Sequence, residues 1–177
     1  ALPIFSSIGL ILLAIVAGLL SCSDSKSTTS NVPELSILGE YLYSSGYDYD
    51  SFILVDLKYS DGDGDLGLNP SDTFGDFAYK KRNFYNLYCW YLEKKNGQWL
   101  EPLNPQSIKD TLTLHERLPN LTPQGSSKSI SGVINFYISA RPNQYRGDTV
   151  KFRFQLVDRA LNRSKMVETK IFTLKHP

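Results

Sequence analysis

The chain has 177 residues and a formal net charge of +1, and 41% of its residues are hydrophobic. Charges that nearly cancel exclude the extended basic surface with which proteins bind nucleic acid, so we expect no nucleic-acid partner. Two cysteines are too few for a disulfide framework, and the length suffices for one domain with a substantial core.

The first 21 residues have the features of a secretory signal. Residues 8–20 (IGLILLAIVAGLL) carry no charge and have the length of a signal core, whereas a membrane span needs about 20 apolar residues. A span that begins near Ala1 is the alternative. The following LLSC, residues 19–22, resembles the lipobox of bacterial lipoproteins. That resemblance implies cleavage after Ser21, lipid on Cys22, and a location on the outer membrane, periplasmic or surface-exposed.

A polar segment follows the cysteine. Residues 23–31 (SDSKSTTSN) contain no apolar anchor, and such a composition does not bury enough surface to become ordered. We therefore expect three parts: a removed signal peptide at 1–21, the lipidated cysteine and a disordered tether at 22–32, and one folded domain at 33–177.

The folded part shows the two-residue period of β-strands. Ile53, Val55 and Leu57 alternate with polar residues, and further strand patterns cover residues 107–114, 129–139, 149–158 and 166–174. Residues 85–103 read as two strands joined at Asn96-Gly97, a dipeptide that tolerates the positive φ angles of a tight hairpin. About seven short strands separated by turns predict an all-β fold, an immunoglobulin-like antiparallel β-sandwich.

One short stretch concentrates negative charge. Residues 59–79 contain five aspartates and no lysine or arginine. The spacing matches positions 1, 3, 5, 7, 9 and 12 of a calcium loop, which are Asp61, Asp63, Asp65, Gly67, Asn69 and Asp72. Leu66 replaces the glycine of an EF-hand and Asp72 replaces its glutamate, so we expect a Ca²⁺-binding turn between strands. The alternative is that the Asp-Gly repeats only form tight turns.

Tyrosines cluster in residues 40–50, EYLYSSGYDYD. Aromatic rings stack on sugars and anchor protein interfaces. The candidate ligand-binding residues are Tyr41, Tyr43, Tyr47 and Tyr49, because they lie among Gly, Ser and Asp and are expected to be exposed. The alternative is that these rings fill the core or cover strand surfaces.

Several segments resemble known bacterial proteins. DRALNRS, residues 158–164, is similar to the D-x-A-x-N-x-S turn between the last two strands of bacterial immunoglobulin-like domains. YSDGDGDLGL (59–68), EKKNGQW (93–99) and LPNLTPQG (118–125) look like recurring features of a group of uncharacterised Bacteroidota lipoproteins. The resemblance implies an immunoglobulin-like fold and a lipid anchor, and it implies no activity.

The sequence contains few of the residues and motifs that are typical of enzyme active sites. Its two histidines are His115 and His176, and it contains no GxSxG, HExxH or glycine-rich phosphate motif. We expect a binding or structural module of the cell envelope that is not an enzyme, with an envelope protein or a glycan as partner. The alternatives are a surface glycan-binding accessory lipoprotein of a polysaccharide-uptake system and, more remotely, a carboxylate-dependent hydrolase that uses the aspartates.

Overall fold

The computed structural model describes residues 30–46, 49–104, 107–124, 128–140 and 148–175. These residues form strands and one short 3₁₀ turn, η1 (Gly75–Phe77), with no α-helix. The strands are β1 (Glu34–Ser44), β2 (Asp50–Asp61), β3 (Leu87–Lys95), β4 (Gln98–Leu100), β5 (Leu103–Asn104), β6 (Ser107–Thr111), β7 (Ile130–Ser139), β8 (Thr149–Leu156), β9 (Val167–Glu168) and β10 (Phe172–Thr173). The predicted all-β class is confirmed. No helix in the described part of the chain is long and apolar enough to cross a membrane.

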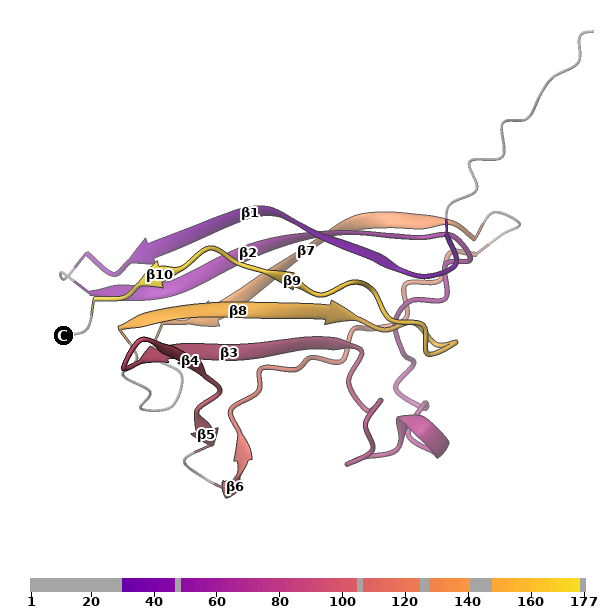
Figure 1. Ribbon diagram of the computed structural model, residues 1–177. Coiled ribbons are helices and arrows are strands. Elements are labelled where there is room, and N and C mark those ends of the chain that lie inside the picture. The colour runs from indigo at the N-terminus through magenta and orange to yellow at the C-terminus, as the bar shows by residue number, and fades with distance from the viewer. Residues whose placement is uncertain (1–29, 47–48, 105–106, 125–127, 141–147, 176–177) are drawn as a thin grey trace, which may run out of the picture.

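The strands form three antiparallel sheets. One sheet has the order β1-β2-β7 and the second has the order β10-β8-β3-β4, with β9 also paired to β8. Figure 1 shows these two sheets as separate layers, with the small β5–β6 sheet extending from the second layer. The described residues contain ten strands, where the sequence predicts about seven. The difference arises because β4, β5, β9 and β10 are only two or three residues long.

Both large sheets contribute to one hydrophobic core. The inward residues of β2, Ile53, Val55 and Leu57, are fully buried, as the alternation predicts. From the second sheet, β8 buries Val150, Phe152, Phe154 and Leu156. The rings of Phe136 in β7 and Phe154 in β8 meet edge to face with centroids 5.2 Å apart. The two-residue period therefore identified the core faces correctly.

The hairpin between β3 and β4 forms at the predicted dipeptide. Lys95 pairs with Gln98, and Asn96 and Gly97 have φ angles of 50° and 82°. Two positive φ angles in a two-residue loop match the right-handed twist of the flanking strands.

Strand β1 was not among the predicted strands. Its register with β2 shifts between Ile37 and Gly39. Before this bulge Ile37 lies opposite Leu57, and after it Leu42 lies opposite Ile53, so the inward positions change from odd to even numbers. Leu38 at the bulge is 63% exposed. The bulge breaks the alternation by which the other long strands are recognised.

Candidate metal centre

The aspartate cluster forms where β2 ends. Asp61 is the last residue of β2, and Asp63 and Asp65 follow in the loop. One carboxylate oxygen from each of the three residues lies within 4.8 Å of the others. The alternate spacing thus turns the first three side chains of the predicted calcium loop toward one point, where they could hold a metal ion.

Asp61 is the most constrained of the three. It is fully buried, and its Oδ2 accepts a hydrogen bond from the backbone N–H of Asp65 at 3.0 Å. Its Oδ1 is buried and has no hydrogen-bond partner among the described residues, and the same is true of one oxygen each of Asp63 and Asp65. Buried carboxylate oxygens are normally hydrogen-bonded or bound to metal, since leaving them unsatisfied is costly.

The pKa values of Asp61 and Asp65 reflect the crowding of these carboxylates. Burial, followed by the charges of Asp63 and Asp65, raises the pKa of Asp61 to about 6. Burial and the charge of Asp63 also raise the pKa of Asp65. A cation at the point of convergence would remove the repulsion and favour the ionised forms.

The glycines of this loop allow it to lie close to two other segments. Gly64 has a φ of 64°, and a Cβ there would lie 1.6 Å from the carbonyl oxygen of Lys128. Gly67 has a φ of 85°, and a Cβ there would lie 1.9 Å from the carbonyl oxygen of Pro119. Both positions therefore require glycine for conformation and for space.

A turn distant in sequence completes the surroundings of the cluster. Ala160 N–H donates to Asp65 Oδ2 at 3.0 Å, and Arg159 N–H donates to the carbonyl oxygen of Asp65 at 3.2 Å. Asp158 is buried; burial is the main cause of its raised pKa, to which the charges of Asp65 and Asp63 also contribute. The guanidinium of Arg159 acts oppositely and lowers the pKa of Asp65. Sequence reasoning noted DRALNRS as a turn motif but missed its place beside the aspartates.

Asp158 itself is oriented by its own turn. Its Oδ1 accepts from Asn162 N–H at 2.7 Å, and its Oδ2 accepts from Asn162 Nδ2 at 2.9 Å. Both of its oxygens therefore have donors, in contrast to Asp61. Asp158 supplies nearby negative charge to the cluster and is not one of the three converging side chains.

The second half of the predicted calcium loop makes other contacts. Asp72 Oδ2 accepts from Asn69 N–H at 2.7 Å, and Asn69 Oδ1 accepts from Asn120 Nδ2 at 2.9 Å. Arg117 donates to the carbonyl oxygens of Asn69 and Asp72. The structure thus brings Asp61, Asp63 and Asp65 together and places the side chains of Asn69 and Asp72 in a separate turn.

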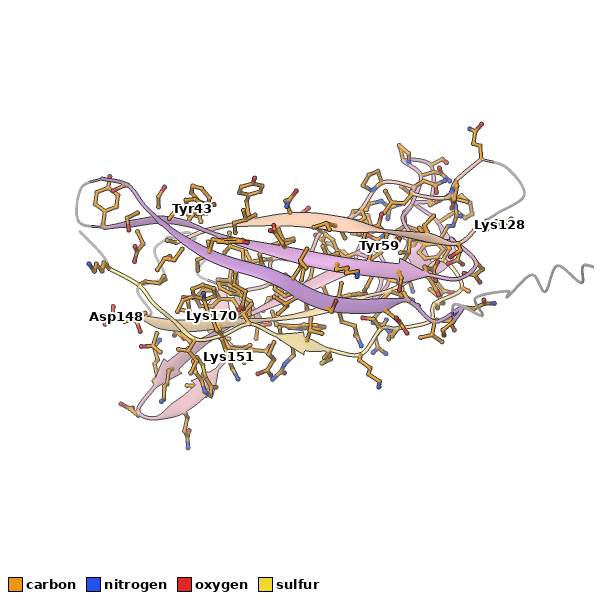
Figure 2. All side chains as sticks on the ribbon, turned by 90° about the horizontal axis from the view of Figure 1, so that it is seen from above. Tyr43, Tyr59, Lys128, Asp148, Lys151 and Lys170 are labelled. Carbon is orange, nitrogen blue, oxygen red and sulfur yellow. The ribbon has the colours of Figure 1, made fainter. Side chains whose placement is uncertain are left out.

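The candidate tyrosines divide into different environments. Tyr41 and Tyr43 are 48% and 41% exposed on β1, while Tyr49 is half-buried and Tyr47 lies outside the described residues. The ring of Tyr43 stacks on Phe52 with centroids 4.5 Å apart, and Phe52 contacts exposed Tyr137 at 5.8 Å. These rings form an aromatic row across β1, β2 and β7. Figure 2 shows Tyr43 toward the opposite end of the molecule from Lys128, which adjoins the aspartate loop.

His115 is held among aromatic rings. The rings of Tyr85, Tyr88 and Trp90 meet it edge to face, and its Nδ1 contacts the backbone N and O of Cys89 at 3.1 and 3.2 Å. Burial lowers its pKa. Burial therefore favours the uncharged form of His115, and one ring nitrogen is already engaged by the backbone.

Cys22, the predicted lipidation site, and His176 lie outside the described residues. Comparisons of the sequence and the structure with protein-family models, curated proteins and solved structures find no match.

Proposed function

We propose that this chain is a lipid-anchored domain of the bacterial cell envelope that acts as a calcium-stabilised binding or structural module. The observation that carries the calcium proposal is the fully buried Asp61, whose unpartnered Oδ1 meets oxygens of Asp63 and Asp65. Calcium is a hard cation that takes six to eight oxygen ligands, and carboxylates are its usual protein ligands.

We infer an immunoglobulin-like β-sandwich as the fold of this module. Two features support it: the β1-β2-β7 and β10-β8-β3-β4 sheets contribute to one core, and the DRALNRS segment connects the adjacent antiparallel strands β8 and β9. In a sandwich, loops gather at the two ends, so a metal at the end of β2 would connect loops and leave the core unchanged.

Direct calcium binding is the first test. Calorimetric titration of Ca²⁺ into the EGTA-stripped soluble domain should give one ion per chain with a dissociation constant on the order of 10⁻⁴–10⁻³ M, as in extracellular calcium modules. Asp61→Asn should abolish the binding heat, because it removes the buried charge. A wild-type domain that gives no heat of binding at about ten times that concentration contradicts the calcium proposal.

The lipid anchor rests on the LLSC resemblance alone and needs its own test. Metabolic labelling with an alkyne fatty acid should tag the wild-type chain and leave Cys22→Ser untagged. Cys89→Ser is the matched control, because this buried free thiol should have no part in lipidation. Lipid on Cys22→Ser would refute the assignment, as would an untagged wild-type chain that retains residues 1–21.

Glycan binding at the aromatic row is the second candidate function. Tyr41, Tyr43 and Tyr137 are exposed, and Phe52 connects them across three strands. Exposed rings in a row suit stacking on successive sugar units. A hydrolase that uses the aspartates has less support, because one carboxylate oxygen each of Asp61, Asp63 and Asp65 is buried, away from a substrate in solution.

A further inference from the structure

A second surface, distinct from the aspartate cluster and the aromatic row, has the features of a ligand site. It is an open groove of about 770 Å³, lined by residues of the 79–88 segment together with Asn104, Asp110, Thr111, Thr113 and His115. In Figure 1 the η1 segment and the β5–β6 hairpin both extend beyond β3, on the side away from β1, β2 and β7. We call this surface the β3 groove.

The β3 groove carries concentrated positive charge. Lys80, Lys81 and Arg82 are consecutive, exposed and line it. Within the described part of the chain, none of the three forms a salt bridge with a carboxylate. Asp110 is the one carboxylate among the lining residues, and burial favours the uncharged form of His115. An anionic ligand would therefore find three cations against one fixed negative charge.

Aromatic rings stand beside these cations. Tyr79 is 69% exposed, and its ring meets Phe84 edge to face with centroids 5.3 Å apart. Phe84 contacts Tyr85 at 5.0 Å, and the guanidinium of Arg117 lies over the Phe84 ring at 5.2 Å. These contacts hold the inner rings in place. The Lys80 ammonium lies over the Tyr79 ring at 5.6 Å, and the ring is otherwise largely exposed.

The groove also supplies neutral hydrogen-bonding groups. Asn104, Thr111 and Thr113 also line the groove. Amides and hydroxyls suit sugar hydroxyls, aromatic faces suit the apolar face of a pyranose ring, and lysine or arginine suits carboxylate or sulfate. An acidic sugar polymer uses all three groups, whereas a neutral glycan leaves the cations without a function.

We propose that the β3 groove binds an acidic polysaccharide, with carboxylate or sulfate groups paired to Lys81 and Arg82 and a sugar ring packed on Tyr79. A nucleic acid would use the same cations, but the net charge of +1 for the whole chain leaves no wide basic surface around them. The choice of a polysaccharide rests on the envelope exposure in the proposed function, because acidic polysaccharides are among the polyanions that an envelope domain meets.

Biolayer interferometry on immobilised dextran tests this proposal with ligands that differ only in charge. The soluble domain should bind carboxymethylated or sulfated dextran and bind unsubstituted dextran of the same chain length far more weakly. Lys81→Gln with Arg82→Gln should weaken binding about tenfold or more, because two charge-assisted contacts are lost. Tyr79→Ala should weaken it about fivefold through the lost ring contact.

Matched variants distinguish binding in the β3 groove from a general attraction of the domain to polyanions. Lys58→Gln with Lys175→Gln removes two exposed charges outside the groove and should change binding less than about twofold. Inorganic polyphosphate should compete only weakly with the charged dextran for the domain. The binding of polyphosphate itself should not change in Tyr79→Ala. Equal loss in the control variant, or polyphosphate competition as strong as that of the sugar polymer, overturns the proposal in favour of a general polyanion surface.

Two further outcomes are decisive. Loss of binding in Tyr41→Ala with Tyr43→Ala, but not in Tyr79→Ala, assigns the sugar to the aromatic row and refutes the β3 groove as the site. If the domain binds neither the carboxymethylated nor the sulfated dextran, the proposal for the β3 groove is refuted. The assay uses a domain without lipid, in EGTA and again in Ca²⁺, so failure of the anchor or of calcium binding leaves the result for the groove unaffected.

Discussion

Calcium at about 10 mM should raise the melting temperature of the soluble domain by about 3–10 °C relative to EGTA. A dissociation constant on the order of 10⁻⁴–10⁻³ M corresponds to about 1.4–2.7 kcal/mol of added stability at this concentration, provided that the ion binds only the folded state. The gain arises because Asp61, Asp63 and Asp65 converge only when β2 and its loop are folded. Differential scanning calorimetry in EGTA, Mg²⁺ and Ca²⁺ measures the shift directly.

Asp63→Asn with Asp65→Asn should remove the calcium shift and also stabilise the domain in EGTA. Two like charges about 5 Å apart repel by about 1 kcal/mol even at the dielectric constant of water, so the variant should melt above the wild type without calcium and should gain nothing when calcium is added. Asp76→Asn with Glu101→Gln removes two exposed negative charges elsewhere and should leave the calcium shift intact. If the wild type melts at the same temperature in EGTA and in Ca²⁺, the loop is only a set of turns.

The second large effect is an unusual pH dependence of the calcium-free domain. Asp61 has an ordinary pKa of 3.8 and a folded-state pKa of about 6, raised by burial and then by its two neighbours. The folded state therefore holds a proton that the unfolded state releases, and stability falls as the pH rises from about 4 to about 6. The size of the loss is about 3 kcal/mol, from two pH units at about 1.4 kcal/mol each. Raised pKa values at Asp65 and Asp158 act in the same direction.

The effect is tested by urea denaturation across this pH range, comparing midpoints where the dependence of the unfolding free energy on urea concentration is unchanged. In EGTA the wild type should lose stability toward neutral pH, and Asp61→Asn should lose clearly less, because the amide does not titrate and only the raised pKa values of Asp65 and Asp158 remain. The wild-type stability curves in EGTA and in Ca²⁺ should coincide near pH 4 and separate above about pH 6, since the ion competes with the proton for the same oxygens. A wild-type domain in EGTA that gains stability between pH 4 and pH 6 would contradict the buried, crowded state of Asp61.

The sequence predicted those parts of the fold that depend on local patterns. Alternation identified β2, β7 and β8 and their buried faces, and Asn96-Gly97 identified the β3–β4 hairpin. It did not identify β1, because the bulge at Leu38 reverses the inward positions partway along the strand. A strand interrupted in this way is recognised through its partner, and the ten paired positions between β1 and β2 appear only in three dimensions.

For the candidate site too, the sequence predicted the contacts that are local in the chain and missed the distant ones. The first three aspartates converge as the two-residue spacing predicts, because neighbouring alternate positions need only one local turn. Asn69 and Asp72 meet Asn120 and Arg117 instead, and these partners lie about fifty residues farther along the chain. Asp158 and Arg159 reach the cluster from a still more distant turn. Spacing in one segment therefore predicted the local ligands and gave no information on the distant ones.

The contacts just before β1 would have a mechanical consequence if the domain is anchored as proposed. The carbonyl oxygen of Ser30 accepts from Gly62 N–H at 2.9 Å, and that of Asn31 accepts from Asn162 Nδ2 at 3.4 Å. Tension on a chain held at Cys22 would therefore enter at the aspartate end and run along β1 toward Tyr43. If the opposing force acts at the Tyr43 end, the β1–β2 pair is loaded in shear, and its hydrogen bonds must break together. A force that pulled β1 away from β2 at one end would break these bonds one at a time, at lower force.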